Sequence, residues 1–133
     1  MQDFNLSKTD PRSLSPAALA FIGDGVFELL ARGRILEKGS MPAHKLHGLS
    51  VQRVCASAQA LAYLVIEPAL NQEELNILKR GRNANTPRVP KSCSPEEYRK
   101  ATAVEALFGY LYLKGELKRA AELFSIIEEN REA

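Results

Sequence analysis

The chain has 133 residues, of which 45% are hydrophobic and 26% charged, so it can bury a core as one domain (1–133) without disulfides or a structural metal. The formal net charge is only +2, which excludes an argument for nucleic-acid binding from overall charge and leaves that question to local clusters. Cys55 and Cys93 lack zinc-site spacing, and no apolar run is long enough to span a membrane. We therefore expect a soluble, cytoplasmic protein with free thiols.

The first predicted helix follows a polar segment, residues 1–13, that we interpret as a loosely ordered lead-in. Ser15 and Pro16 are typical of an N-cap and a first helical residue, and the helical pattern runs to about Glu37. Its apolar residues cover two faces, which indicates burial on both sides, with a second copy of the chain as a candidate partner. The expected core stripe is Leu19, Ile22, Val26, Leu29 and Leu30, and the second face is Ala17, Ala20, Phe21, Asp24, Phe27 and Ala31.

The unusual feature of this helix is Asp24, a carboxylate set between Gly23 and Gly25 inside an apolar run. Glycine in a helix interior costs roughly 1 kcal/mol relative to alanine, so two of them around a charge predict a close backbone approach, a functional constraint, or both. Our interpretation is that Asp24 belongs to a metal site.

The middle of the chain is also helical in pattern. Residues 44–66 predict one long helix that ends before Pro68, and a shorter helix follows from residue 71 to about Arg82. His44 and His47 are three residues apart and could share a face as metal ligands. The alternative is that they are polar residues on a solvated helix face, and no third ligand is evident nearby.

Residues 79–91 form a basic segment with five cationic side chains and no acid. One reading is a solvated loop. The functional reading is a loop that contacts phosphates, because like charges repel one another unless a polyanion binds there. The candidate residues for phosphate and sugar contacts are Lys79, Arg80, Arg82, Asn83, Asn85, Thr86, Arg88 and Lys91.

The next helix repeats the pattern of the first. Ser94 and Pro95 predict its start, and it runs to about Lys114 with a single acid, Glu105, in an otherwise apolar-looking second face. A last helix is expected over residues 116–129. Since no β pattern occurs, the predicted fold class is all-α, a compact bundle of about six helices.

A lone carboxylate on an apolar helix face is often paired or partly exposed, but two of them together suggest a cation site. If the helices that carry Asp24 and Glu105 pack side by side, two ionised and unpaired carboxylates would be costly. Mg²⁺ prefers oxygen ligands and keeps several waters, so two carboxylates plus substrate phosphate would suit it. Beside a phosphate-binding loop, such an ion would activate water for attack on phosphorus.

Several motifs carry a family resemblance. The run LAFIGDGVFE resembles the signature of the ribonuclease III family, and TAVEALFGYLYL resembles its second acidic motif. With RGRNANTPRVPK, the chain is most similar to the Mini-III subgroup, for which we expect no double-stranded-RNA-binding domain. The resemblance implies a homodimeric, all-α endoribonuclease that cleaves double-stranded RNA with Mg²⁺ and matures large-subunit (23S) ribosomal RNA precursors.

The resemblance also implies residue roles. Asp24 and Glu105 match the catalytic, metal-binding acids, and Phe21 matches the aromatic residue that packs into the partner subunit. Two further acids usual in the family are replaced here by Ala20 and Thr102, so we expect one Mg²⁺ per site, with water held by the Thr102 hydroxyl in place of a ligand.

Glu28, one turn beyond Asp24, could orient a metal-bound water, or it could pair with an arginine. The rival function is a non-catalytic RNA-binding or ribosome-associated helical module on the same fold. The replacements at Ala20 and Thr102 favour that rival, whereas the presence of both Asp24 and Glu105 opposes it.

Overall fold

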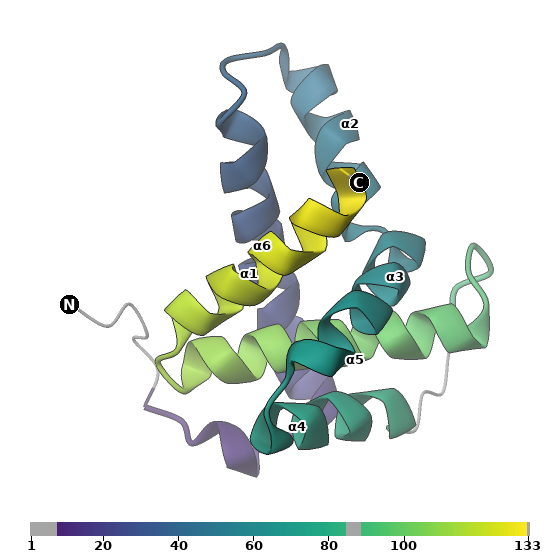
Figure 1. Ribbon diagram of the computed structural model, residues 1–133. Helices are drawn as coiled ribbons and strands as arrows, with labels where there is room; N and C mark the ends of the chain where they lie inside the picture. The colour runs from purple at the N-terminus through teal and green to yellow at the C-terminus, as the bar shows by residue number, and fades with distance from the viewer. Residues whose placement is uncertain (1–7, 85–88, 133) are drawn as a thin grey trace.

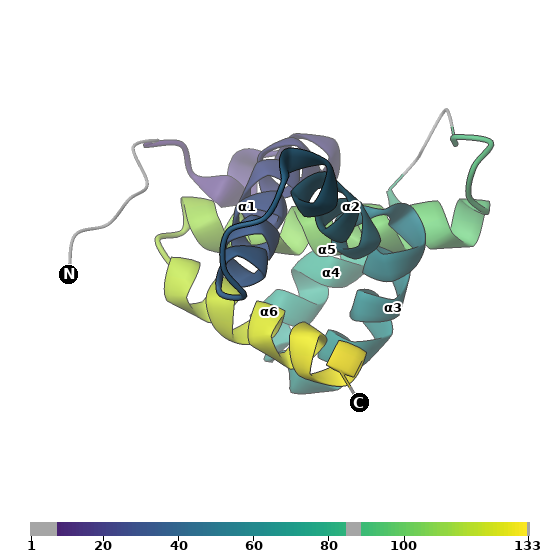
Figure 2. The same ribbon diagram turned by 90° about the horizontal axis from the view of Figure 1, so that it is seen from above.

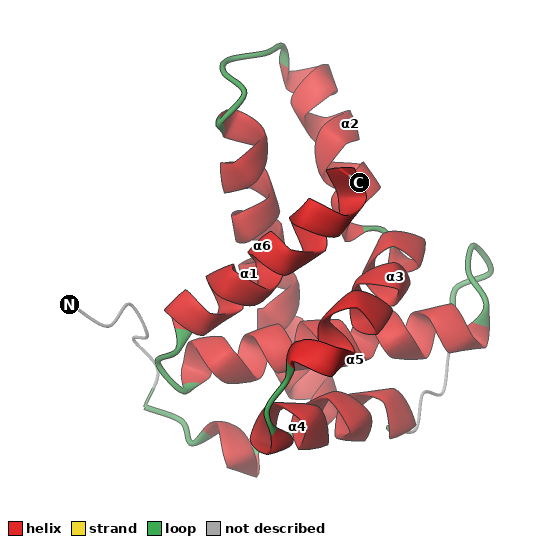
Figure 3. Ribbon diagram, viewed as in Figure 1, coloured by secondary structure: helices red, strands yellow, loops and turns green. Residues whose placement is uncertain are grey.

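The computed structural model describes residues 8–84 and 89–132, and within them all regular structure is helical (Figures 1 and 3). This confirms the predicted all-α class and the expectation of about six helices. Two short 3₁₀ turns accompany the helices, η1 (Pro11–Ser13) and η2 (Glu67–Ala69). The helices are α1 (Pro16–Leu36), α2 (Ala43–Val54), α3 (Ala56–Ile66), α4 (Gln72–Asn83), α5 (Pro95–Leu113) and α6 (Leu117–Glu132).

The helix starts are fixed by side-chain caps. The Ser15 hydroxyl accepts a hydrogen bond from a backbone N–H of the first turn of α1, as predicted. Both α4 and α5 begin with capping boxes, in which Asn71 and Ser94 accept from the backbone while Glu74 and Glu97 accept from the N-cap N–H groups. These caps satisfy backbone donors that the helix itself leaves unpaired.

The predicted single helix over residues 44–66 is wrong, because the chain breaks at Cys55. That residue is extended (φ −67°, ψ 159°), and α2 and α3 meet at an angle of 50°. The end of α2 is held by Arg53, a buried residue whose Nε donates to Glu128 Oε1 on α6 at 3.1 Å. The break lets α2 pack along α1 while α3 turns to lie against α5 (Figure 1).

In the ranges 8–84 and 89–132 no single helix is long and apolar enough to span a bilayer. Within these ranges, only α2 taken together with the bent segment of α3 and η2 has the length and composition of a span.

Helix α5 is the centre of the molecule, with α1, α3, α4 and α6 packed around it (Figure 2). Leu107 and Phe108 are fully buried, and the Phe108 ring meets the edge of Phe27 on α1 at a centroid distance of 5.1 Å. Phe27 also meets Phe124 of α6 at 5.3 Å. The apolar second face that the sequence shows on α5 is therefore explained by neighbours on every side.

The predicted faces of α1 need correction. Leu29, expected in the core, is 67% exposed, whereas Phe27 and Ala31, expected on the second face, are buried. The reason is that a helix with apolar residues nearly all round does not specify which arc faces the core, and the packing of α5 against α1 decides it.

Candidate active site

The site begins with a crossing of two helices at two glycines. Gly23 of α1 and Gly109 of α5 lie so close that a Cβ on Gly23 would stand 2.6 Å from the Glu105 carbonyl carbon and 2.8 Å from Gly109 N. A Cβ on Gly109 would stand 2.9 Å from Gly23 N. Only residues without a side chain allow the two backbones to touch in this way. The predicted close approach is thus present at Gly23, but Gly25 has open space beside it.

The crossing brings Asp24 and Glu105 together. Asp24 is exposed and Glu105 is half-buried, and the two carboxyl groups interact directly. The pKa of Glu105 is raised from 4.5 to about 8, first because burial disfavours the charged form and second because the negative charge of Asp24 lies beside it. The condition set by the sequence, that the two acidic helices pack side by side, is met.

The donor set at this position fits a hard divalent cation. Asp24 opposes the ionisation of Glu105, and a positive ion beside the pair would relieve that effect. Mg²⁺ is commonly bound by one or two carboxylates, with waters completing the shell. Within the described ranges no group of three or more His, Cys, Asp and Glu side chains gathers as a metal site. The protein would therefore supply two carboxylates here, Asp24 and Glu105, and water or phosphate would supply the rest.

Ala20 and Thr102, which stand where the family usually has acids, differ in how deeply they are buried. Ala20 belongs to the hydrophobic core cluster and is 9% exposed, whereas Thr102 is half-buried on α5, three residues before Glu105 and so on the same helix face. A hydroxyl at Thr102 has the geometry to face the site, and Ala20 adds no ligand. Their proposed consequence, a single ion with more water ligands, stays a prediction.

Glu28 is held by an ion pair. Its Oε2 lies 2.5 Å from Nη2 and 3.0 Å from Nε of Arg32, one turn further along α1. The arginine pairing that the sequence left open is thus present, and the role of Glu28 toward metal-bound water stays a prediction. His44 and His47 are both exposed on α2, as the solvated-face alternative expects.

The basic segment is partly helical, which corrects its description as a loop. Lys79, Arg80, Arg82 and Asn83 lie in the last turns of α4, where cations also favour the negative end of the helix dipole. Lys79, Arg80 and Asn83 are exposed, and Arg82 is half-buried. Lys91, also exposed, lies in the turn before α5, while Asn85, Thr86 and Arg88 fall outside the described residues.

Two of these cations already have protein contacts. Arg80 Nη2 donates to the Leu14 carbonyl oxygen at 3.3 Å. Arg82 interacts with the Tyr63 hydroxyl. Burial raises the pKa of Tyr63, and the positive charge of Arg82 opposes that rise. Lys79 and Lys91 are therefore the most available of the described cations for an external phosphate.

The end of α4, which carries part of the basic segment, packs on α5 through one close contact. Gly81 of α4 packs on Ala103 of α5, and a Cβ at Gly81 would stand 2.8 Å from the Ala103 Cα. Ala103 is two residues from Glu105, which on a helix is a turn of about 200°, so the end of α4 packs at the level of Glu105 but on another face of α5. The structure therefore does not itself place the cationic turn against the carboxylate pair.

Sequence reasoning missed Gln59, a residue of α3 that is only 2% exposed and whose side chain interacts with the Glu105 carboxyl. The available signal was a single amide in the apolar run ASAQALAYLVI, at a position that packing against α5 buries. Without the fold, a glutamine near a helix start is indistinguishable from a surface residue.

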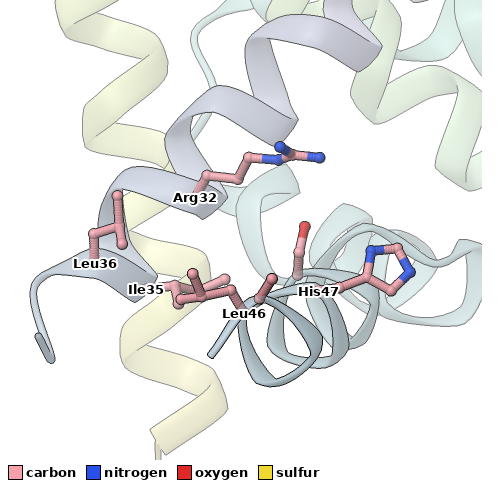
Figure 4. Close-up of a pocket in the computed structure, with 7 residues that line it drawn as sticks. Arg32, Ile35, Leu36, Leu46 and His47 are labelled. Atoms are coloured by element: carbon pink, nitrogen blue, oxygen red, sulfur yellow. The ribbon is translucent and has the colours of Figure 1, made fainter. Parts of the chain in front are cut away.

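The outer side of α1 carries an exposed apolar line. Phe21, Leu29 and Leu36 are 83%, 67% and 55% exposed. Beside the last of these, a cavity of about 300 Å³ opens between the C-terminal end of α1 and α2 (Figure 4). It is lined by Arg32, Ile35, Leu36, Ala43, Leu46, His47 and Ser50.

Comparison with known proteins assigns this fold to a class of nucleases. The model of the Ribonuclease III domain matches residues 17–116. A crystal structure of a protein from Fusobacterium nucleatum superposes with a TM-score of 0.82 at 33% identity, covering 93% of this chain and 99% of that one.

Curated relatives give the subgroup. A Mini-ribonuclease 3 from Brevibacillus brevis is 42% identical over 96% of this chain and 98% of that relative, and one from Symbiobacterium thermophilum is 41% identical over 86% and 88%. A third, from Gloeobacter violaceus, is 49% identical over 77% and 74%. The chain belongs to the Mini-ribonuclease 3 group of the ribonuclease III family and is an endoribonuclease.

Proposed function

We propose that this endoribonuclease cleaves double-stranded RNA with Mg²⁺ held by Asp24 and Glu105. The observation that carries the proposal is the meeting of these two carboxylates at the Gly23–Gly109 crossing, where Glu105 cannot ionise readily without a cation. When bound there, the ion would supply an activated water and offset the charge that develops on the phosphate. The two carboxylates would hold the ion from two different helices, Asp24 from α1 and Glu105 from α5.

Duplex recognition in this proposal depends on backbone contacts. The major groove of A-form RNA is too narrow for base reading, so phosphates and 2′-hydroxyls are the available targets. Lys79 and Arg80 at the end of α4, with Lys91 before α5, provide exposed cations for such contacts. Asn83 adds a neutral group, and Asn85, Thr86 and Arg88 remain part of the proposed surface from sequence alone.

The first test is incubation of the purified protein with a long RNA duplex, in Mg²⁺ or in excess EDTA. The proposal expects strand scission only in Mg²⁺. Binding without scission in either buffer would instead support the rival function, a non-catalytic RNA-binding module. The observation that favours this rival is the presence of Ala20 and Thr102 where the family usually has acids.

We propose further that two copies assemble through the exposed line of α1. Phe21 and Leu36 are separated by about 22 Å along the helix, with Leu29 near the midpoint. Two antiparallel α1 helices related by a two-fold axis near Leu29 would place each Phe21 at the partner's cavity beside Leu36. A cavity of about 300 Å³, with Ile35, Leu36 and Leu46 in its walls, is large enough for a phenyl ring.

The dimer is tested by sedimentation across protein concentration. Burying one Phe side chain contributes roughly 1.5–3 kcal/mol, and two are buried per dimer, so Phe21→Ala should weaken association by about 100-fold or more. Leu64→Ala changes an exposed apolar side chain on a different helix, α3, and is the matched control; it should leave the sedimenting mass unchanged. A wild-type mass that stays monomeric at every concentration would refute the dimer.

The natural substrate in this proposal is a precursor of large-subunit ribosomal RNA, acted on in the cytoplasm. The support is the membership in the Mini-ribonuclease 3 group and the two free thiols, Cys55 and Cys93, which suit a reducing compartment. Incubation with a precursor 23S terminal stem, compared with an unrelated duplex of equal length, tests it; equal rates would count against a dedicated substrate.

A further inference from the structure

Gln59 occupies an unusual position for an amide. It lies in the first turn of α3 and is 2% exposed, among buried neighbours that are otherwise apolar or aromatic: Ala60, Ala62, Tyr63 and Ile66. Buried polar groups in proteins are nearly always hydrogen-bonded, and each exception calls for an explanation.

The side chain of Gln59 lies close enough to the Glu105 carboxyl to interact with it. Yet Nε2 has no hydrogen-bond partner within the part of the chain that the structure describes. A buried donor left unpaired costs about 1–3 kcal/mol. Gln59 therefore offers a hydrogen-bond donor that awaits an acceptor.

We propose that Gln59 is a positioning residue, which donates a hydrogen bond from Nε2 to the ionised Glu105 carboxylate and fixes its orientation toward the divalent cation. The inference rests on the proposed function, because it requires a cation at Asp24 and Glu105. Carboxylates that bind metals are generally hydrogen-bonded by a second group, and loss of that group typically weakens metal binding 10- to 100-fold.

The chemistry of an amide suits this role. A neutral donor holds a carboxylate without adding a positive charge that would compete with the cation, whereas a lysine or arginine in its place would form an ion pair with Glu105. The donor also comes from α3, so a third helix joins α1 and α5 in shaping the site. The packing of α3 against α5, which the break at Cys55 permits, is what delivers Gln59 to Glu105.

The experiment measures Mn²⁺ affinity of the full chain by titration, without RNA, alongside urea unfolding in EDTA. Gln59→Met removes the donor at similar volume, and Gln72→Met, on an exposed glutamine of α4, is the matched control. We expect Mn²⁺ affinity about 10-fold weaker in Gln59→Met, unchanged in Gln72→Met, and metal-free stability of Gln59→Met equal to or above wild type, because an unpaired donor has been removed. Gln59→Asn, which draws the amide back by one methylene, should weaken Mn²⁺ binding in the same direction.

The outcomes separate the two levels of the argument. If wild type binds no Mn²⁺, the metal site of the proposed function fails and the role of Gln59 fails with it. If wild type binds Mn²⁺ and Gln59→Met and Gln59→Asn bind it equally well, only the positioning role is overturned. A loss of stability in EDTA that accompanies weaker binding would show that Gln59 is structural, and would overturn the inference too.

Discussion

Replacing Gly23 by alanine tests the helix crossing on which the site is built. The new Cβ would stand 2.6 Å from the Glu105 carbonyl carbon and 2.8 Å from Gly109 N, whereas ordinary contacts of this kind begin near 3.4 Å. Both neighbours are backbone atoms of α5 and cannot rotate away, so the helices must separate. Overpacking of this kind typically costs about 1–3 kcal/mol and occasionally more, which outweighs the ~1 kcal/mol that alanine gains over glycine in a helix.

Gly25→Ala is the matched control, since its Cβ would meet nothing within 4 Å, and Gly33→Ala is a second control in the same helix. Each should raise the stability by up to about 1 kcal/mol. Urea unfolding followed by circular dichroism in EDTA, at several protein concentrations, measures all three variants, and Mn²⁺ titration checks the site. Because both variants gain the same helix propensity, we expect Gly23→Ala to be less stable than Gly25→Ala by the overpacking cost, about 1–3 kcal/mol or more, and to bind Mn²⁺ more weakly. Equal stability of the two variants would refute the crossing.

Three further predictions follow from charge. In EDTA, the stability of wild type relative to Glu105→Gln should fall as pH rises from 4.5 to about 8, by up to ~1.4 kcal/mol per pH unit. The cause is that the Glu105 carboxyl of the folded protein keeps a proton that the unfolded chain has already released. A stability difference that does not change with pH would contradict this. Replacing Lys79 and Arg80 by alanine should reduce the slope of log affinity for duplex RNA against log salt by about one per lost phosphate contact, and an unchanged slope would exclude these contacts. Glu128→Gln should cost about 3–5 kcal/mol in urea unfolding, because Arg53 would remain buried without its partner; a loss below ~1 kcal/mol would show that this pair is not needed.

The sequence was sufficient for the helices whose ends carry local signals. Ser15 and Ser94 are caps that act within one turn, so α1 and α5 begin where predicted. It was insufficient at Cys55, where α2 ends beside a long-range pair between Arg53 and Glu128, 75 residues apart. Local pattern carries no information on such a partner.

The same distinction applies to the site. Asp24 and Glu105 stand out in sequence as single acids in apolar faces, and their meeting required only that α1 and α5 pack together. Gln59 could not be found, since its importance comes from the way α3 is turned against α5. The exposed face of α1 was also misassigned at Leu29, because helical periodicity alone cannot choose between two apolar arcs.

In the proposed function, Asp24 and Glu105 together hold the cation on which cleavage of duplex RNA depends. The most direct measurement compares wild type, Asp24→Asn and Glu105→Gln for Mg²⁺-dependent scission of one RNA duplex, with binding of the same duplex measured in parallel. The account predicts that each variant loses scission while it retains binding. Scission at the wild-type rate by either variant would contradict it.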